Sequence, residues 1–228
     1  DDGAITYFRV GDTMAQYPTS TIDSLTFGSN SNTIFIKYNG TQVSVVNPLA
    51  FEGVAVSVTG TDVIVTATIE TQDINYNLSG VTTNGMFKIY SAKRFNLQLN
   101  GVQITNPDGP AINIQSEKKA SVELVTGTVN SLTDGVTYAA PAVNGNGEPE
   151  DQDGTFFSEA KMVFSGAGSL TIEGNATDKH ALCSDDLIQI TGGTITVTKA
   201  VKDGIHANEG IEISGGTINV KASGDAID

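Results

Sequence analysis

The chain has 228 residues, with 12 basic and 26 acidic side chains and a formal net charge of −14 at pH 7. This charge disfavours nucleic acid as a partner, because phosphate binding requires a basic surface. No apolar stretch is long enough to span a bilayer, and the single cysteine, Cys183, excludes an internal disulfide. The length is sufficient for one domain.

The N-terminal part contains short runs of alternating apolar residues, which predict β-strands. The runs are residues 5–10, 22–27, 33–38, 43–46, 54–58 and 63–69. They are expected to form either irregular first turns of the repeat that follows or a small sheet that caps its open end. Residues 1–80 are therefore treated as a strand-rich N-terminal region, and residues 81–228 as the repetitive part of one continuous domain.

The repetitive part shows apolar pairs two residues apart, interrupted by glycines where a strand must turn. Its apolar sets are Leu97, Leu99, Val102, Ile104, Ile112 and Ile114; Val122, Leu124 and Val129; and Met162, Phe164, Leu170, Ile172 and Leu182. The clearest repeat relates residues 187–205 to residues 210–227, where Ile190, Gly192 and Val197 have equivalents 23 residues later. Self-similarity at a fixed period of this size is typical of stacked repeats.

These features predict an all-β fold, a parallel β-helix. Each coil would contain roughly 20–25 residues, and adjacent turns would lie about 4.8 Å apart. The polar and acidic segment 143–154 (VNGNGEPEDQDG) is expected to protrude as a solvated loop. At the C-terminus, residues 225–228 match residues 203–206 and no polar capping repeat follows. The native chain is therefore expected to continue, or its end to be covered by another domain or subunit.

The repeat register aligns polar residues of successive turns along one edge of the coil. Leu182, Ile205 and Ile227 are predicted to be equivalent interior positions, and this fixes the neighbouring columns. The columns contain His180, Asp203 and Asp225; Cys183, His206 and Asp228; Asp185 over Asn208; and Asp186 over Glu209. This edge therefore gathers carboxylates, an amide and both histidines of the protein, with successive members about 5 Å apart.

Carboxylates stacked at this spacing repel one another, so they must be solvated, partly protonated or bridged by a cation. Calcium suits these residue types, because it takes about six to eight oxygen ligands. The alternative is that Asp203 and Asp225 form turns through bonds to backbone amides. His180 and His206 indicate either zinc or acid–base chemistry, or simple bonds to carboxylates of neighbouring turns. Cys183 is most simply a small packed side chain.

Several segments resemble a carbohydrate-binding β-helix family that includes clostridial cellulose- and acid-sugar-binding proteins. The segments are LNGVQITNPDGPAINIQSEK at 99–118, VTGTVNSLTDG at 125–135, TFFSE at 155–159, FSGAGSLTIEGN at 164–175, KHALCSDDLIQITGGTITV at 179–197 and KDGIHANEGIEISGGTINV at 202–220. In addition, IDSLTF at 22–27 resembles the openings of Bacteroides-type surface proteins. The resemblance covers roughly residues 20–228.

This resemblance implies a right-handed, pectate-lyase-like parallel β-helix that carries calcium and binds acidic plant polysaccharide without cleaving it. It also implies a secreted or cell-surface location, which includes an outer-membrane-attached lipoprotein. By position, the matching acidic turns hold the candidate calcium ligands Asp185, Asp186, Asp203, Asn208, Asp225 and Asp228. The candidate contacts along the same edge are His180, His206 and Glu209.

Three functions follow, in order of preference. A non-catalytic binding protein would use calcium to join its own carboxylates to those of a polygalacturonate-like chain. A polysaccharide lyase would need calcium and a basic residue, for which Lys179 and Lys202 are placed beside the acidic edge. A structural, adhesin-like surface scaffold is the third. The edge does not exclude a hydrolase either, because stacked Asp203 and Asp225 could mimic its carboxylate pair.

Aromatic residues bear on the type of polysaccharide. The chain lacks Trp, so neutral polysaccharide is disfavoured, because its binding commonly uses indole stacking platforms. Tyr38, Tyr76, Tyr90 and Tyr138 remain possible platforms, although burial on a strand is the simpler account of each.

Overall fold

The computed structural model describes residues 5–10, 13–18 and 31–228. Two compact units divide the chain after Ser31. In the first unit, β1 (Ile5–Val10) pairs antiparallel with β2 (Thr13–Pro18), which confirms the strand predicted at 5–10. The strand predicted at 22–27 lies outside the described residues.

The second unit, residues 32–228, is built from β-strands. They are β3 (Thr33–Asn39), β4 (Gln42–Val46), β5 (Val54–Thr59), β6 (Asp62–Ala67), β7 (Ile74–Thr82), β8 (Phe87–Ser91), β9 (Phe95–Asn106), β10 (Ile112–Ile114), β11 (Ala120–Leu124), β12 (Val129–Asp134), β13 (Gly154–Ser158), β14 (Met162–Gly166), β15 (Ser169–Glu173), β16 (His180–Ser184), β17 (Leu187–Ile190), β18 (Thr194–Lys199), β19 (Ile205–Ala207), β20 (Gly210–Ile213) and β21 (Thr217–Val220). The described part of the chain contains no helix that could cross a bilayer.

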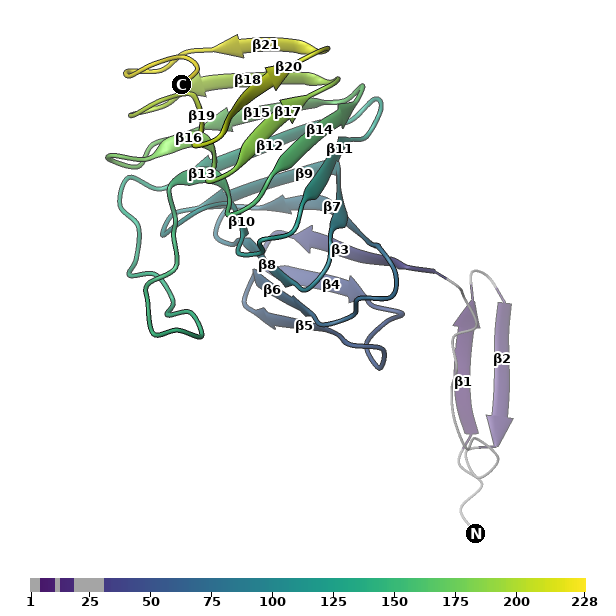
Figure 1. Ribbon diagram of the computed structural model, residues 1–228. Coiled ribbons are helices and arrows are strands. Elements are labelled where there is room, and N and C mark those ends of the chain that lie inside the picture. Colours follow the sequence, from purple (N-terminus) through teal and green to yellow (C-terminus); the bar gives the residue numbers. More distant parts are fainter. Residues whose placement is uncertain (1–4, 11–12, 19–30) are drawn as a thin grey trace. The chain divides into compact units, whose positions relative to one another are not determined.

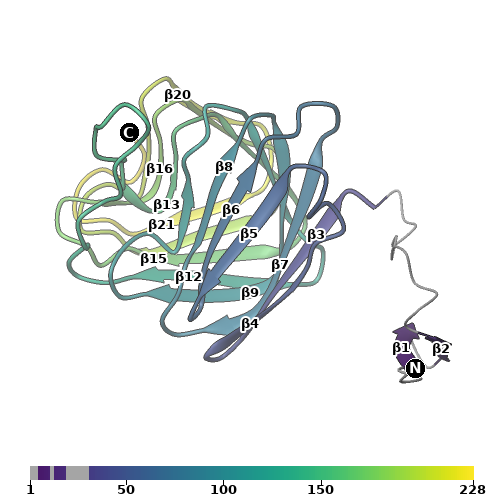
Figure 2. The same cartoon turned by 90° about the horizontal axis from the view of Figure 1, so that it is seen from below.

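From β6 onward the strands stack in parallel columns (Figure 1, Figure 2). The first column contains β6, β8, β10, β13, β16 and β19. The other sheet carries two further columns, which end in β20 and in β21 and share the long strand β9. Gly101, whose φ is 74°, lies between the half of β9 that pairs with β11 and the half that pairs with β12. The result is a solenoid of about six turns.

The register of this solenoid is the one that the repeat predicts. Leu182 pairs with Ile205, and Cys183 pairs with His206. Ile205 in turn forms a parallel bridge with Ile227. In the other columns, the paired equivalents lie 23 residues apart, as in the β17–β20 and β18–β21 pairs. The predicted all-β, parallel β-helix is therefore confirmed.

Apolar side chains alternate into the interior of the coil, as a two-residue period requires. Leu182 and Ile205 are 0% exposed, as predicted, whereas Ile227 in the last turn is 44% exposed. The prediction that Val129 faces the interior is wrong, because this side chain is 64% exposed. The next residue, Asn130, is buried in its place.

Asn130 occupies an interior position because the corner beside it leaves backbone groups to be satisfied. Its Oδ1 accepts the N–H groups of Gly101 and Val102, each at 2.9 Å. Its Nδ2 donates to the carbonyl of Ser169 at 2.9 Å. The side chain thus bonds backbone from the turns on either side of its own, which a valine could not do.

The N-terminal part of this unit contains both parallel and antiparallel strand pairs. β3 pairs parallel with β7 and β6 pairs parallel with β8, so both strands continue the columns. β4 and β5 fold back antiparallel on β3 and β6 respectively, and they close this end of the sheets. Residue 80 lies inside β7, and the division at this residue stays a prediction.

Candidate functional site

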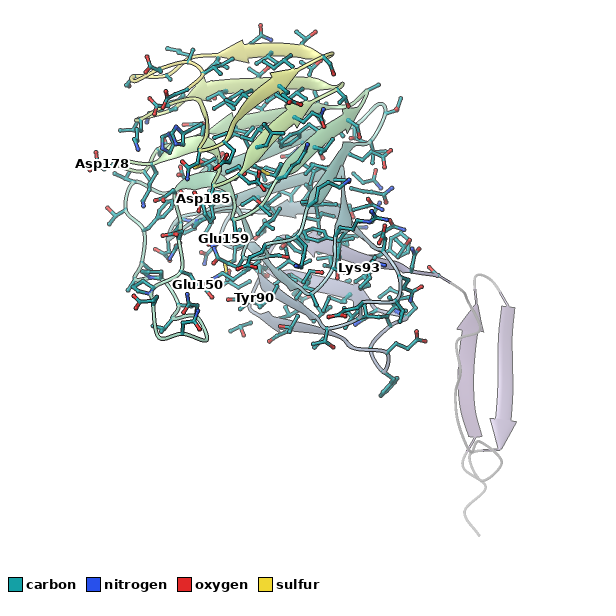
Figure 3. The ribbon with its side chains drawn as sticks, in the orientation of Figure 1. Tyr90, Lys93, Glu150, Glu159, Asp178 and Asp185 are labelled. Carbon is teal, nitrogen blue, oxygen red and sulfur yellow. The ribbon has the colours of Figure 1, made fainter. Side chains whose placement is uncertain are left out.

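We call the side of the coil where the first-column strands end the trailing edge. The turns that follow these strands form a groove along it. Three adjoining hollows of about 400, 420 and 570 Å³ share lining residues along it. The first two share Tyr90, Gln115 and Glu117, and the last two share Glu117 and Glu159. Figure 3 shows Tyr90, Glu159 and Asp185 in succession on this side of the coil. Side chains of several turns therefore line one continuous surface.

We call this surface the acidic groove, because most of the charged side chains that line it are carboxylates. The carboxylates are Glu117, Glu150, Glu159, Asp185, Asp186 and Glu209. Lys118 is the one basic side chain among the described residues that line the groove. Three residues predicted at the acidic edge, Asp185, Asp186 and Glu209, are thus brought together here. A fourth, Asn208, joins them by donating its Nδ2–H to Asp185 Oδ1 at 3.1 Å.

Three carboxylates form a cluster beside the groove. Oxygens of Asp151, Glu159 and Asp185 all lie within 4.8 Å of one another. Burial raises the pKa of Glu159 to about 7, and the charges of Asp185 and Asp151 raise it in the same direction. Burial also raises the pKa of Asp185 to about 6, with Asp151 and Asp153 contributing. Among the described residues, no Lys or Arg forms an ion pair with this cluster, and His206 lowers the pKa of Asp185 only in part.

Backbone bonds between turns hold two members of this cluster in place. The N–H of Glu159 donates to the carbonyl of Ile114 at 3.0 Å, and the N–H of Asp185 donates to the carbonyl of Ser158 at 3.0 Å. Each acidic residue immediately follows a first-column strand. The pairing of Ser158 with Ser184 therefore places Glu159 and Asp185 on adjacent turns, one above the other. The separation of the two carboxylates is thus set by the fold.

The loop that precedes β13 supplies one wall of the groove, and a buried ion pair anchors it. Glu150 is 6% exposed, and its Oε2 lies 2.8 Å from Lys88 Nζ. Tyr90 Oη donates to Glu150 Oε1 at 2.6 Å. The solvated loop predicted at 143–154 is therefore correct for its exposed first half but wrong for Glu150, which packs against the first column.

The other predicted aspartates lie away from the groove. Asp203 and Asp225 are at the leading edge, where the chain approaches the first-column strands. Asp203 is 8% exposed, and its Oδ1 accepts the backbone N–H of Asp225 at 2.7 Å. Asp203 thus makes the turn-forming bond that the sequence offered as an alternative to metal binding. Asp225 and Asp228 are both exposed.

Both histidines lie beside a carboxylate of the next turn, as predicted. His180 Nδ1 is 3.2 Å from Asp203 Oδ2, and His206 Nδ1 is 2.9 Å from Asp228 Oδ2. The two imidazole rings stack, with centroids 4.2 Å apart and planes 12° from parallel. Burial lowers the pKa of His180 to about 4. Cys183 is buried, as expected for a packed side chain.

The sequence alone did not single out Asp151, Glu159 or Glu150. A signal for Glu159 was present, because Ser158 and Ser184 are paired equivalents and each is followed by an acidic residue. The spacing between these serines is longer than the 23-residue repeat nearer the C-terminus, which obscured the alignment. No comparable signal marks the loop residues, since their place depends on how the loop folds back.

The tyrosines offer little stacking surface. Tyr38 and Tyr76 are 1% and 0% exposed, so burial accounts for both. Tyr138 donates its hydroxyl to Asp134 at 2.6 Å. Tyr90 lines the acidic groove, with its hydroxyl engaged by Glu150.

Comparison with known proteins shows that this chain is similar to carbohydrate-binding domain-containing proteins. A family profile described as carbohydrate-binding domain-containing protein matches residues 59–228. A carbohydrate-binding domain-containing protein from Acetivibrio thermocellus is 32% identical over 126 residues, which are 54% of this chain. The match spans 41% of that relative, so the chain covers less than half of its length.

Among solved structures, the coil is similar to that of the polysaccharide lyase-like protein from C. thermocellum, in a gadolinium derivative. The TM-score is 0.72 at 28% sequence identity, and the alignment covers 86% of this chain and 73% of that one. The family match at residues 59–228 lies within the second unit, residues 32–228, which forms the coil. The chain belongs to the family of carbohydrate-binding domain-containing proteins.

Proposed function

We propose that this protein binds acidic polysaccharide of the polygalacturonate type without cleaving it, and that Ca²⁺ bridges the acidic groove to uronate carboxylates of the ligand. Family membership supports a carbohydrate-binding role. The observation that carries the finer proposal is the cluster of Asp151, Glu159 and Asp185, two of which line the groove.

The donor set fits calcium. All three groups offer carboxylate oxygens, which this hard cation prefers. Two oxygens bound to one Ca²⁺ at about 2.3–2.6 Å can be no more than about 4.6–5.2 Å apart. The mutual limit of 4.8 Å within the cluster is compatible with a single ion. Water and ligand oxygens would complete the coordination, since three carboxylates do not fill six to eight positions.

Calcium would supply the charge that this groove lacks. An acidic surface repels a polyuronate, and the 14-unit excess of negative charge strengthens that repulsion. A shared cation converts the two opposed carboxylates into ligands of one centre. The hollows extend over several turns of the coil, so the groove can accept a chain of sugars rather than one.

A lyase would need a base that faces the bound uronate. Lys179 is held by Asp153, with Nζ and Oδ1 2.6 Å apart, and it does not line the groove. Lys118 lines the hollow of about 400 Å³ and is the residue to examine if cleavage is found.

We also propose a secreted or cell-surface location, because that is where plant-type polysaccharide is encountered.

Retention on insoluble polygalacturonate tests the proposal. We expect the full chain to bind with calcium and to be released by a chelator, and we expect Glu159→Gln and Asp185→Asn to weaken retention at least about tenfold together. Glu212→Gln, which removes the same charge from β20, is the matched control and should bind as the parent does. Retention that is unchanged by the chelator and by both substitutions would contradict the calcium bridge.

The same incubation separates binding from cleavage. A lyase generates an unsaturated product that absorbs in the ultraviolet, whereas the proposed binding protein generates none. Product that accumulates with calcium and disappears in Lys118→Ala would assign the groove to a lyase. Failure to retain any acidic or neutral polysaccharide would instead favour a structural scaffold.

A further inference from the structure

A second set of potential ligands includes nitrogen donors and is joined to the three-carboxylate cluster through Asn208, which contacts both His206 and Asp185. His180, Asp203 and His206 each offer one ligand atom, and these atoms lie within 4.8 Å of one another. The residues come from two adjacent turns, since β16 pairs with β19. They are also better shielded, because His180 is 2% exposed and Asp203 is 8% exposed.

The Nδ1 atom of His180 has an unusual environment. It is buried, and it has no hydrogen-bond partner among the described residues. Asp203 Oδ2 nevertheless approaches it to 3.2 Å. The two atoms are therefore close without the alignment that a hydrogen bond requires. A buried polar atom left in this state calls for an explanation, such as an ion between the two groups.

The separation of these atoms suits two ligands of one small cation. Zinc holds nitrogen and oxygen ligands at about 2.0–2.1 Å with tetrahedral angles, which places neighbouring ligand atoms about 3.3–3.4 Å apart. The observed 3.2 Å is close to this value.

Neighbouring groups hold the candidate ligands in orientation. Asp203 Oδ1 is occupied by the backbone N–H of Asp225 at 2.7 Å, which leaves Oδ2 directed to His180. The ring nitrogens of His206 lie 2.9 Å from Asp228 Oδ2 and 3.1 Å from Asn208 Oδ1. A ligating histidine commonly bonds a carboxylate through its second nitrogen. Binding through one nitrogen of His206 would therefore replace one of these contacts and retain the other.

We propose that His180, Asp203 and His206 bind a transition-metal ion of the zinc class, with Asp228 orienting the His206 ring. Imidazole donors select zinc, copper or nickel over calcium, so this site is chemically distinct from the all-oxygen cluster of the acidic groove. The rings stack almost in parallel, and coordination requires His206 to tilt toward the ion. The side chain of His206 is 22% exposed, which leaves it room to do so.

Metal titration of the chelator-treated full chain tests this proposal. We expect zinc chloride to bind with one equivalent per chain in calorimetry, in the presence of excess calcium. Cobalt(II) in the same site should give visible absorption bands of low-symmetry coordination, and zinc should displace them. His180→Gln and His206→Gln should each abolish the bands, and Asp228→Asn should weaken zinc binding about 10–100-fold.

The controls separate loss of the site from loss of the fold. Glu212→Gln lies on β20, removes one charge like Asp228→Asn, and should leave zinc affinity unchanged. Circular dichroism reports whether each variant is folded. Should the buried His180→Gln fail to fold, the partly exposed His206→Gln decides the matter. The proposal is overturned if the parent chain shows no saturable zinc binding, or if folded His206→Gln binds zinc as the parent does.

Discussion

The two edges of the first-column strands use carboxylates in different ways. At the leading edge, Asp203 accepts a backbone N–H and Asp153 pairs with Lys179. At the trailing edge, Glu159 and Asp185 face other carboxylates, and their pKa values are raised to about 7 and about 6. The partner of an acidic residue, rather than its place in the repeat, therefore decides whether it supports a turn or is available to a cation.

Breaking a buried pair beside the groove should have the largest effect on stability. Lys88→Met removes the basic partner of Glu150. The carboxylate of Glu150, a residue that is 6% exposed, is then left without a cation. We expect a loss of about 3–5 kcal/mol in the free energy of unfolding, because an uncompensated buried charge is costly. Urea unfolding measures it. The double variant Lys88→Met with Glu150→Gln should recover much of the loss, and a single-variant loss below about 1 kcal/mol would refute this account.

At the leading edge, Asp203→Ala should have the next largest effect. It removes a charged acceptor from the N–H of Asp225 and from the surroundings of His180. The expected cost is about 1.5–3 kcal/mol, the range for hydrogen bonds to charged groups. Asp225→Ala keeps that backbone bond and alters an exposed side chain, so it should change stability by no more than about 0.5 kcal/mol. Equal effects of the two substitutions on chemical denaturation would show that the bond does not support the turn.

The trailing edge should lose stability as pH rises, whereas the leading edge should gain it, because burial lowers the pKa of His180 to about 4. The folded-state pKa values of Glu159 and Asp185 are raised, so each contributes stability in its protonated form, and this is lost as pH rises through about 6 and 7. The contribution of the trailing edge should therefore fall between pH 5 and pH 8 in the calcium-free protein, and comparison of the parent with Glu159→Gln isolates it, because both keep His180. Glu159→Gln should remove about 1 kcal/mol of this decrease after allowance for solvent screening.

Chemical denaturation at both pH values, with chelator present, measures this difference. Glu212→Gln should leave the pH dependence of the parent unchanged. Calcium should reduce the decrease in stability at pH 8, because it replaces the proton as the neutralising partner of the cluster. A pH dependence of stability that is the same in the parent and in Glu159→Gln would contradict the raised pKa assigned to Glu159 at the trailing edge.

Much of the fold could be predicted from the sequence, because burial and register leave a periodic record. Ile190 and Val197 have equivalents 23 residues later, and the structure pairs them as expected. The burial of Asn130 could not be predicted in this way. Its amide is buried because it bonds the backbone N–H groups of Gly101 and Val102, and apolar periodicity does not report such bonds. The period also failed at Ile227, which is paired but remains 44% exposed.

The site was only partly accessible from the sequence. Asp185, Asp186 and Glu209 were placed on one edge by register alone, and the acidic groove brings them together. Asp151 and Glu150 come from a loop whose path depends on the buried contacts of Lys88 and Tyr90, so periodicity carried no information about them. A repeat thus predicts which residues stack, but not which of them lack partners.

If one calcium ion is bound by protein and ligand together, each ligand must raise the affinity of the other, and thermodynamic coupling measures this most directly. Calcium affinity should be determined by calorimetry with and without a short oligogalacturonate, and oligogalacturonate affinity with and without calcium. We predict that each raises the affinity for the other by the same factor, at least about fivefold, and that Asp185→Asn with Glu159→Gln abolishes the coupling. Affinities that are independent of one another in the parent chain would contradict the shared ion.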